Sequence, residues 1–140
     1  MIAAVALDTN AYSGFRKGDT DLAEVISRVP RLNLPLVVLA ELLAGFAGGR
    51  KSVHNRTELA MFMASPRVSI LPPDRETAEV YARVFQQLRT DGHPIPTNDI
   101  WIAAACIQHQ IPLVSLDHHF VHVAGLRSAG GLADLLRRAE

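Results

Sequence analysis

Four carboxylates interrupt apolar segments of this chain, where a hydrophobic core would otherwise exclude charge. They are Asp8, Glu41, Asp99 and Asp117. If the fold gathers them in one pocket of low dielectric, they repel one another strongly. A hard divalent cation with oxygen ligands, Mg²⁺ or Mn²⁺, resolves that repulsion and can also recruit phosphate. The residue types therefore indicate a metal site that acts on a phosphate-containing ligand.

Glu41 has the weakest structural explanation of the four. It is the only polar side chain of residues 38–46, a segment predicted to be helical and to have no solvated face. None of its helical neighbours three and four residues away can pair with a charge: these are Val37, Val38, Ala44 and Gly45. Because an unpaired buried carboxylate is costly, we expect Glu41 to find a partner elsewhere in the fold, a cation being the natural one.

The other three acids each have a structural alternative. Asp8 and Asp117 follow apolar segments, and both positions are also typical of turn or helix-capping residues. Asp99 lies in the first turn of a predicted helix, where an acid is favoured by about 0.3–1 kcal/mol. That helix continues through residues 100–105, which are apolar nearly all round. Its first turn is therefore expected to lie against the sheet and not in open solvent.

Short apolar segments alternate with helical ones along the chain. Strands are predicted at residues 2–7, 34–38, 68–71 and 113–116, with 121–123 as a candidate fifth, and residues 8–10 are expected to form a turn. Helices are predicted at residues 21–29, 39–46, 54–63, 99–109 and 132–139, and from the cap Asp74 to Asp91-Gly92. Thr97 is the expected cap of helix 99–109, residues 125–131 are expected to be loop, and the helix after Asp74 is predicted to bury Ala78, Tyr81, Val84, Phe85 and Leu88.

This alternation predicts an α/β fold with a central, mainly parallel sheet of four to five strands flanked by helices. In such folds, ligands bind outside the carboxyl ends of the strands. Asp8 and Asp117 each follow a predicted strand, so both are expected at that edge. The pattern thus places two of the four acids where a ligand site is expected.

The composition fits a single domain of 140 residues with a real core, since 49% of the residues are apolar. Equal numbers of acidic and basic residues, 14 each, exclude a strongly basic nucleic-acid footprint. The single cysteine, Cys106, lies in an apolar run and favours a reducing, cytoplasmic environment. We expect neither a signal peptide nor a membrane span, because the first apolar run ends at Leu7 and none approaches the ~20 residues that a span requires.

Several other motifs are weaker. Residues 45–52 come close to a phosphate-binding glycine loop, but Arg50 replaces the second glycine and the segment follows a helix; Arg50, Lys51 and Arg56 are more typical of a solvated helix end than of an RNA contact. His118, His119 and His122, or Cys106 with His109, lack a full zinc ligand set. An aspartate-dependent phosphatase would carry a second Asp where this chain has Asn10, and a receiver domain would require a lysine after the last strands.

In sequence order, the motifs resemble those of the PIN-domain nucleases, and the chain length resembles the VapC-type toxins of toxin–antitoxin pairs. The resemblance is carried by Asp8-Thr9-Asn10, Glu41, Asn98-Asp99 before Ile102-Ala103-Ala104, and Ser115-Leu116-Asp117 with Phe120. It covers essentially the whole chain, residues 1–140, as one PIN domain. Each motif is common, whereas the ordered set of four is specific. Trp101 departs from the pattern and is expected to narrow the approach to the site.

The resemblance implies a three-layer PIN-like sandwich and a Mg²⁺- or Mn²⁺-dependent endoribonuclease. It also implies a homodimer and inhibition by a small cognate antitoxin. By this likeness Asp8, Glu41, Asp99 and Asp117 form the catalytic and metal-binding site, supported by Thr9, Asn10 and Ser115. A non-catalytic RNA- or protein-binding module on the same fold and a structure-specific DNA nuclease stay open as alternatives. The sequence does not identify the RNA that would be cleaved.

Overall fold

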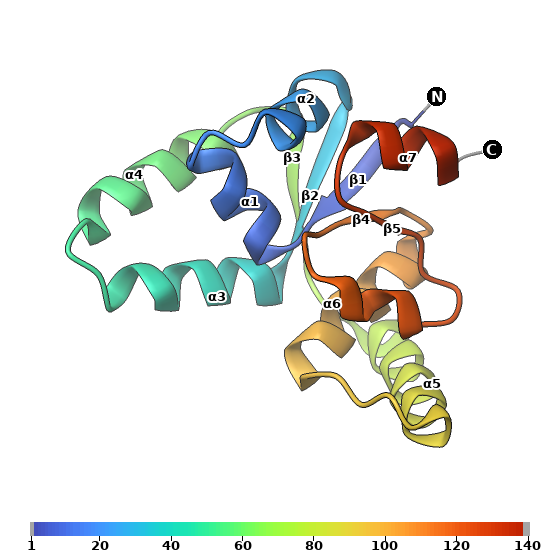
Figure 1. Cartoon of the computed structure of the whole chain (residues 1–140). Helices are drawn as coiled ribbons and strands as arrows, with labels where there is room; N and C mark the ends of the chain where they lie inside the picture. The colour runs from blue at the N-terminus through green and yellow to red at the C-terminus, as the bar shows by residue number, and fades with distance from the viewer. Residues whose placement is uncertain (1, 139–140) are drawn as a thin grey trace.

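Five parallel strands form the central sheet of the computed structural model, which describes residues 2–138 (Figure 1). The spatial order is β3-β2-β1-β4-β5, with β1 at the centre. The strands are β1 (Ala4–Leu7), β2 (Arg31–Pro35), β3 (Val68–Leu71), β4 (Leu113–Val114) and β5 (Ser128–Ala129). The predicted α/β class and parallel sheet are thus confirmed.

Helices cover both faces of this sheet and make the fold a three-layer sandwich. In Figure 1, α1, α2 and α4 lie on one side of the sheet, and α5 and α6 lie on the other. The helices are α1 (Thr9–Arg16), α2 (Thr20–Arg28), α3 (Leu36–Ala47), α4 (Ser52–Met63), α5 (Arg75–Asp91), α6 (Thr97–His109) and α7 (Leu132–Arg138), with a 3₁₀ helix η1 (His118–His122). Ala139, the predicted end of the last helix, lies outside the described residues.

The core is densest around the central strand. Val5, Ala6 and Leu7 are completely buried, because helices cover β1 on both faces. Cys106 is buried as predicted, and this burial raises the pKa of its thiol. Within residues 2–138, no helix is both long and apolar enough to cross a membrane.

Strand β2 lies earlier in the chain than predicted. It ends at Pro35, and helix α3 begins at Leu36, so that Val37 and Val38 lie in the first turn of the helix instead of continuing the predicted strand 34–38. Leu32, Leu34 and Pro35 are the buried members of the true strand. Asn33 interrupts the apolar run between them and hid the strand. Its side-chain Nδ2 is accommodated because it donates to the carbonyl of Val5 on the neighbouring strand, at 3.1 Å.

The carboxyl-terminal part of the sheet also differs from the prediction. Residues 121–123 are not a strand: Asp117 caps a 3₁₀ helix there, and Val121 is exposed. The fifth strand is Ser128–Ala129, inside the segment expected to be loop. Two small residues carry no detectable hydrophobic pattern. Their pairing with β4 is set by the tertiary fold.

The starts of α1 and α6 also differ from the prediction, and so does the buried face of α5. Residues after Asp8 form helix α1 instead of a turn, and Pro96, not Thr97, occupies the N-cap position of α6. Helix α5 begins after Asp74 as predicted and ends at Gly92, which adopts a left-handed φ of 75° that suits glycine. Its predicted apolar face is partly wrong, since Ala78 and Phe85 are exposed. The buried residues are Thr77, Val80, Val84 and Leu88.

Candidate active site

The carboxyl edge of the sheet carries an open pocket of about 600 Å³ in which all four predicted acids meet. Asp8 follows β1, Glu41 comes from α3, Asp99 from the first turn of α6, and Asp117 from the loop after β4. The pocket is lined by Asp8, Thr9, Asn10, Ser13, Glu41, Pro96, Thr97, Asn98, Asp99 and Asp117. Residues up to 109 positions apart in sequence therefore share one cavity.

Asp8 is the innermost of the four acids, with 4% of its surface exposed. The register of the sheet fixes its position, because its backbone N–H donates to the Val114 carbonyl at 3.0 Å and so aligns it with the end of β4. One carboxylate oxygen accepts from the Thr9 N–H at 2.8 Å, and the other accepts from Ser115 Oγ at 2.7 Å. Asp8 thus caps α1 and also presents a charge to the pocket.

The loop after β4 is tied to α1 by two of the predicted supporting residues. Asn10 Oδ1 accepts from the Leu116 N–H at 2.9 Å. Ser115 Oγ, besides donating to Asp8, accepts from the Asp117 N–H at 3.0 Å. Because Asn10 and Ser115 hold the backbone that carries Asp117, their contacts place that acid beside Asp8.

Glu41 finds its partners across the pocket, as expected, but its helix is not fully buried. Helix α3 has an exposed face that includes Leu36, so the prediction that it has no solvated side is wrong, and Glu41 itself is half-buried. Its Oε1 accepts from Thr9 Oγ1 at 2.6 Å, and its Oε2 accepts from Asn98 Nδ2 at 3.4 Å. Two neutral donors therefore orient the Glu41 carboxylate in the pocket.

Asp99 and Asp117 flank the ring of His119. Nε2 of the ring lies 2.7 Å from Asp99 Oδ2, and Nδ1 lies 2.9 Å from Asp117 Oδ1. Asp117 also caps the 3₁₀ helix, because its Oδ1 accepts from the His119 N–H at 3.3 Å. Asp99 is mostly buried, whereas Asp117 is 41% exposed and marks the mouth of the site.

Burial dominates the electrostatics of the two inner acids. It raises the pKa of the Asp8 carboxyl despite the hydrogen bonds from Ser115 and Thr9, and the charges of Asp99 and Glu41 raise it further. Burial likewise raises the pKa of Asp99, opposed in part by His119. Among the side chains that the structure describes, no lysine or arginine forms an ion pair with any of the four acids.

These residues fit a divalent cation. One oxygen each of Asp99 and Asp117 and one nitrogen of His119 lie within 4.8 Å of one another. The His119 Nε2 atom is buried and makes no aligned hydrogen bond to any residue of the described chain, although a carboxylate oxygen lies beside it. A buried polar atom of this kind requires a partner, and a cation held by the carboxylates of Asp99 and Asp117 would provide one.

Sequence reasoning assigned no role in this site to two residues, Asn98, which it named only as part of a motif, and His119. Asn98 precedes Asp99 in the first turn of α6, where neighbouring side chains converge on the end of the sheet. His119 follows Asp117 by two residues and was considered only as a zinc ligand with other histidines. Its position next to the last predicted acid was the available signal.

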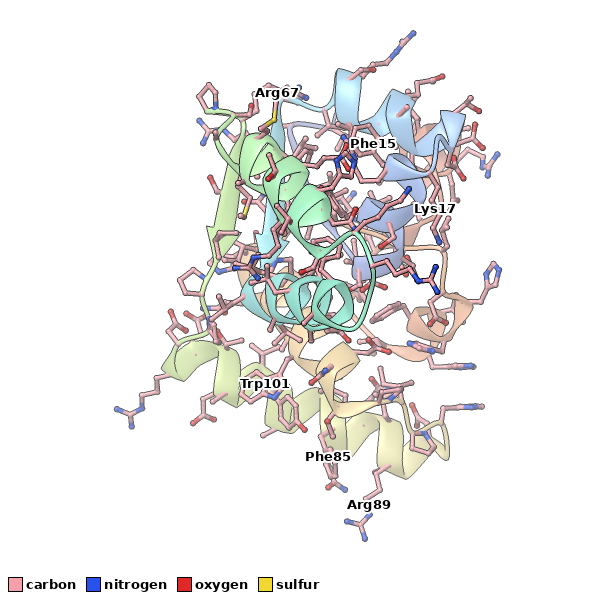
Figure 2. The ribbon with its side chains drawn as sticks, turned by 90° about the vertical axis from the view of Figure 1, so that its left-hand side faces the viewer. Phe15, Lys17, Arg67, Phe85, Arg89 and Trp101 are labelled. Atoms are coloured by element: carbon pink, nitrogen blue, oxygen red, sulfur yellow. The ribbon has the colours of Figure 1, made fainter. Side chains whose placement is uncertain are left out.

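Trp101, which was expected to narrow the approach to the site, packs on Tyr81 with ring centroids 4.4 Å apart and does not line the pocket (Figure 2).

A second pocket of about 390 Å³ adjoins the acidic one, and Ser13 lines both. Its walls come from α1, the end of α3 and α4. Three cationic side chains, Arg16, Lys17 and Lys51, line it together with His54. Arg16 is paired with Glu58, whereas Lys17 and Lys51 form no ion pair with any acid among residues 2–138 and supply the free positive charge of this pocket. The aromatic ring of Phe15 turns toward α4 and packs on Phe62, which joins α1 to α4 (Figure 2).

The family model described as PIN domain matches residues 5–126 of the chain. That range includes all four acids of the pocket and every residue that hydrogen-bonds to them.

Curated and solved relatives agree with this match. The chain is 29% identical over 127 residues to "Ribonuclease VapC5" of Mycobacterium tuberculosis, which covers 90% of this chain and 92% of that protein. The structure of VapBC-1 from nontypeable Haemophilus influenzae has the same fold, with a TM-score of 0.80 at 24% identity over 90% of this chain and 96% of that one. VapBC-5 from M. tuberculosis, described as a member of the VapBC family of toxin-antitoxin systems, gives a TM-score of 0.68 at 27% identity over 91% and 96%.

Proposed function

Because the chain belongs to the PIN domain family, we propose that it is a divalent-metal-dependent endoribonuclease, the toxin of a toxin–antitoxin pair. One observation carries the catalytic part of this proposal. Four carboxylates from separate elements meet in one pocket, and within residues 2–138 no lysine or arginine forms an ion pair with them. A fold that retains such a cluster sacrifices stability unless a cation binds there.

Each acid has a role that its position supports. Asp8, which is buried, and Asp99, whose side chain is 15% exposed, are assigned as primary ligands, and Glu41 and Asp117 as further ligands or groups that orient water. Mg²⁺ or Mn²⁺ suits this oxygen-rich set, whether as one ion or two. When bound, such an ion supplies a water nucleophile at neutral pH and stabilises the leaving oxygen of a phosphodiester. Thr9 holds Glu41, and Ser115 and Asn10 hold Asp8 and the Asp117 loop.

The cationic pocket supports RNA as the substrate. It adjoins the acidic pocket at Ser13 and offers Lys17 and Lys51 to a phosphate backbone. A nucleic-acid strand bound there would reach toward the acidic site, because Ser13 lines both pockets. This arrangement also explains how a chain of zero net charge can bind a polyanion, since the local charges and the metal, not the overall balance, attract the strand.

Cleavage assays test the catalytic proposal. Purified wild-type protein is incubated with total cellular RNA in Mg²⁺, in Mn²⁺ or in EDTA, beside Asp99→Asn. We expect cleavage in either metal, none in EDTA, and none by the variant. Equal activity of wild type and Asp99→Asn would overturn the enzyme assignment and favour a non-catalytic binding module. Cleavage of structured DNA but not RNA would make the protein a DNA nuclease, and mapping of the cut sites would identify the RNA target.

The toxin proposal is supported by the relatives, which are named VapC or VapBC. We expect induced expression of the chain to arrest growth, and co-expression of the adjacent small open reading frame to relieve the arrest by supplying the antitoxin. Continued growth under strong induction would contradict the assignment. The homodimer and the organisation as a single PIN domain, which the resemblance implies, stay predictions, as does the cytoplasmic location expected from the single cysteine. Sedimentation of the purified protein would test the dimer.

A further inference from the structure

We propose that His119 is a nitrogen ligand of the ion in the acidic site: its Nε2 atom binds the ion beside Asp99, while Asp117 holds its Nδ1 atom. This inference rests on the proposed metal site and adds a histidine to the four predicted acids. It converts an all-oxygen site into a mixed one. The observations that carry it are the position of the ring, the unmet Nε2 atom and the rigidity of the segment that carries His119.

The imidazole ring lies between two carboxylates that belong to different elements. Nε2 lies 2.7 Å from Asp99 Oδ2, and Nδ1 lies 2.9 Å from Asp117 Oδ1. The two ring nitrogens therefore face different partners. Histidines that bind metals through one nitrogen characteristically donate the other N–H to a carboxylate, which fixes the tautomer and the ring orientation. Asp117 is placed to accept from Nδ1, and that leaves Nε2 for the ion.

Nε2 is the ring nitrogen that lacks a hydrogen-bond partner among the described residues. It is buried and makes no aligned hydrogen bond within the described residues, despite its short distance to Asp99. Buried polar atoms are normally paired, and an exception requires an explanation. Because one nitrogen of His119 and one oxygen each of Asp99 and Asp117 lie within 4.8 Å of one another, an ion that contacts Asp99 is also within reach of His119.

The segment that carries His119 is fixed on both sides. Asp117 caps the 3₁₀ helix by accepting from the His119 N–H, and the next side chain, Phe120, is completely buried. The rings of His119 and Phe120 pack at a centroid distance of 4.8 Å. A histidine on so short and anchored a turn cannot swing far from the pocket. Its ring is preorganised for binding, as a metal ligand requires.

A nitrogen ligand changes which ion the site favours. Carboxylates and water suit Mg²⁺ and Mn²⁺ alike, whereas imidazole binds Mn²⁺ and the later transition metals better than it binds Mg²⁺. We therefore expect His119 to raise the preference of the site for Mn²⁺ over Mg²⁺. If His119 only held the two carboxylates in position, its removal would weaken the two ions alike.

The test is direct detection of the nitrogen by pulsed EPR of bound Mn²⁺. Metal-free protein is loaded with Mn²⁺ and compared with protein in which histidine carries ¹⁵N. We expect a ¹⁴N coupling in the spectrum of the wild type, and a ¹⁵N coupling in its place in the labelled protein. The ¹⁴N coupling should be lost in His119→Ala and retained in His118→Ala. His118 is the matched control because it is an exposed neighbour outside the cluster. Absence of the coupling from the wild type, or its persistence in His119→Ala, would overturn the proposal.

Binding isotherms provide the second readout. His119→Ala and His119→Gln should weaken Mn²⁺ binding by about tenfold or more and Mg²⁺ binding by clearly less. Equal losses for both ions would overturn the nitrogen ligand and leave a positioning role. Failure of the proposed function is distinguishable: the wild type would then bind neither ion, or Asp99→Asn would bind both as tightly as the wild type. The wild-type spectrum decides the question even if the variants unfold.

Discussion

Two neighbouring helices each carry an aspartate at their N-terminal end, and the two carboxylates lie in different electrostatic environments. Asp74 caps α5, and Asp99 lies in the first turn of α6, which packs against α5 on the same side of the sheet (Figure 1). Both positions are favourable to an acid, because the N-terminal end of a helix is electropositive. What differs is how far the surroundings satisfy the charge.

At the start of α5 the charge is fully satisfied by neighbours. Asp74 Oδ1 accepts from the Thr77 N–H at 3.1 Å and from Gln108 Nε2 at 2.8 Å, and Thr77 Oγ1 accepts in return from the Asp74 N–H. The hydrogen bond from the Thr77 backbone, followed by that from Gln108, holds the pKa of Asp74 below its ordinary value. This acid is structural and needs nothing further.

At the start of α6 the charge is only partly compensated, by the His119 ring 2.7 Å away. Burial raises the pKa of Asp99, His119 offsets this in part, and the charges of Glu41 and Asp117 raise it again. No hydrogen bond from a backbone N–H to this carboxylate is found among residues 2–138. The comparison shows that a helix-start acid identifies a functional site only where the fold leaves its charge unmet.

The matched pair Asp99→Asn and Asp74→Asn gives the largest expected contrast. RNA cleavage should fall at least about a hundredfold in Asp99→Asn, because even supporting partners of metal ligands act on that scale. Asp74→Asn should cleave like the wild type. Initial rates on one labelled RNA measure both. A comparable loss in Asp74→Asn would show that the two helix starts do not differ in function.

Thermal stability should separate substitutions at the two positions in the opposite sense, with Ala in place of Asn at position 74 because Asn is itself a good N-cap. In EDTA, Asp74→Ala should melt a few degrees below the wild type, because its helix loses a capping box. Asp99→Asn should melt above the wild type, because a buried charge that lacks compensation is removed. Added Mn²⁺ should stabilise the wild type and leave Asp99→Asn unchanged. Scanning calorimetry with and without the ion is the measurement, and a lower melting temperature for Asp99→Asn in EDTA would contradict it.

Much of this contrast was readable from the sequence, but not all. Asp74 was predicted as a cap from the turn residues before an amphipathic segment. The four acids stood out because they interrupt apolar runs. The features that the sequence did not predict depend on tertiary contacts. Thr77, for example, is buried although it is polar, because Gln108 of the adjacent helix accepts a hydrogen bond from its hydroxyl group. A polar residue satisfied by a distant partner has no signature in the local pattern.

The same reason accounts for the missed elements and site residues. Asn33 broke the pattern of β2 because its partner, the Val5 carbonyl, lies on another strand. His119 was grouped with other histidines because its distance to Asp99 arises only when the β4 loop folds over α6. Periodicity detects burial by hydrophobic residues. It is blind to polar groups whose partners are brought together by the fold.

The pH dependence of stability should differ between the two helix starts. A raised pKa means that the ionised Asp99 destabilises the metal-free fold at neutral pH, and this cost disappears as the pH falls through the raised value. The stability difference between Asp99→Asn and wild type should therefore shrink between neutral pH and about pH 4. The ionised Asp74 stabilises the fold at pH values above 3.8, the ordinary pKa of its carboxyl. This contribution is lost only as the pH falls through the lowered pKa of Asp74.

The difference in unfolding free energy between Asp74→Ala and the wild type should accordingly stay constant over the pH range in which the difference between Asp99→Asn and the wild type shrinks. Urea unfolding in EDTA at a series of pH values measures both differences. If the Asp99→Asn difference were constant and the Asp74→Ala difference varied above 3.8, the assigned environments of the two acids would be exchanged.

The smallest contrast concerns the two amides that serve these helix starts. Gln108 donates to Asp74 at 2.8 Å, and Asn98 donates to Glu41 at the longer distance of 3.4 Å. Asn98→Ala should slow cleavage only about twofold, because a long, exposed hydrogen bond contributes near the lower end of about 0.5–1.5 kcal/mol, and Thr9 still holds Glu41. Gln108→Ala should lower the melting temperature and leave cleavage intact. If Asn98→Ala instead abolished cleavage with its fold preserved, Asn98 would hold the substrate or the ion itself, and the boundary of the active site would extend to the whole first turn of α6.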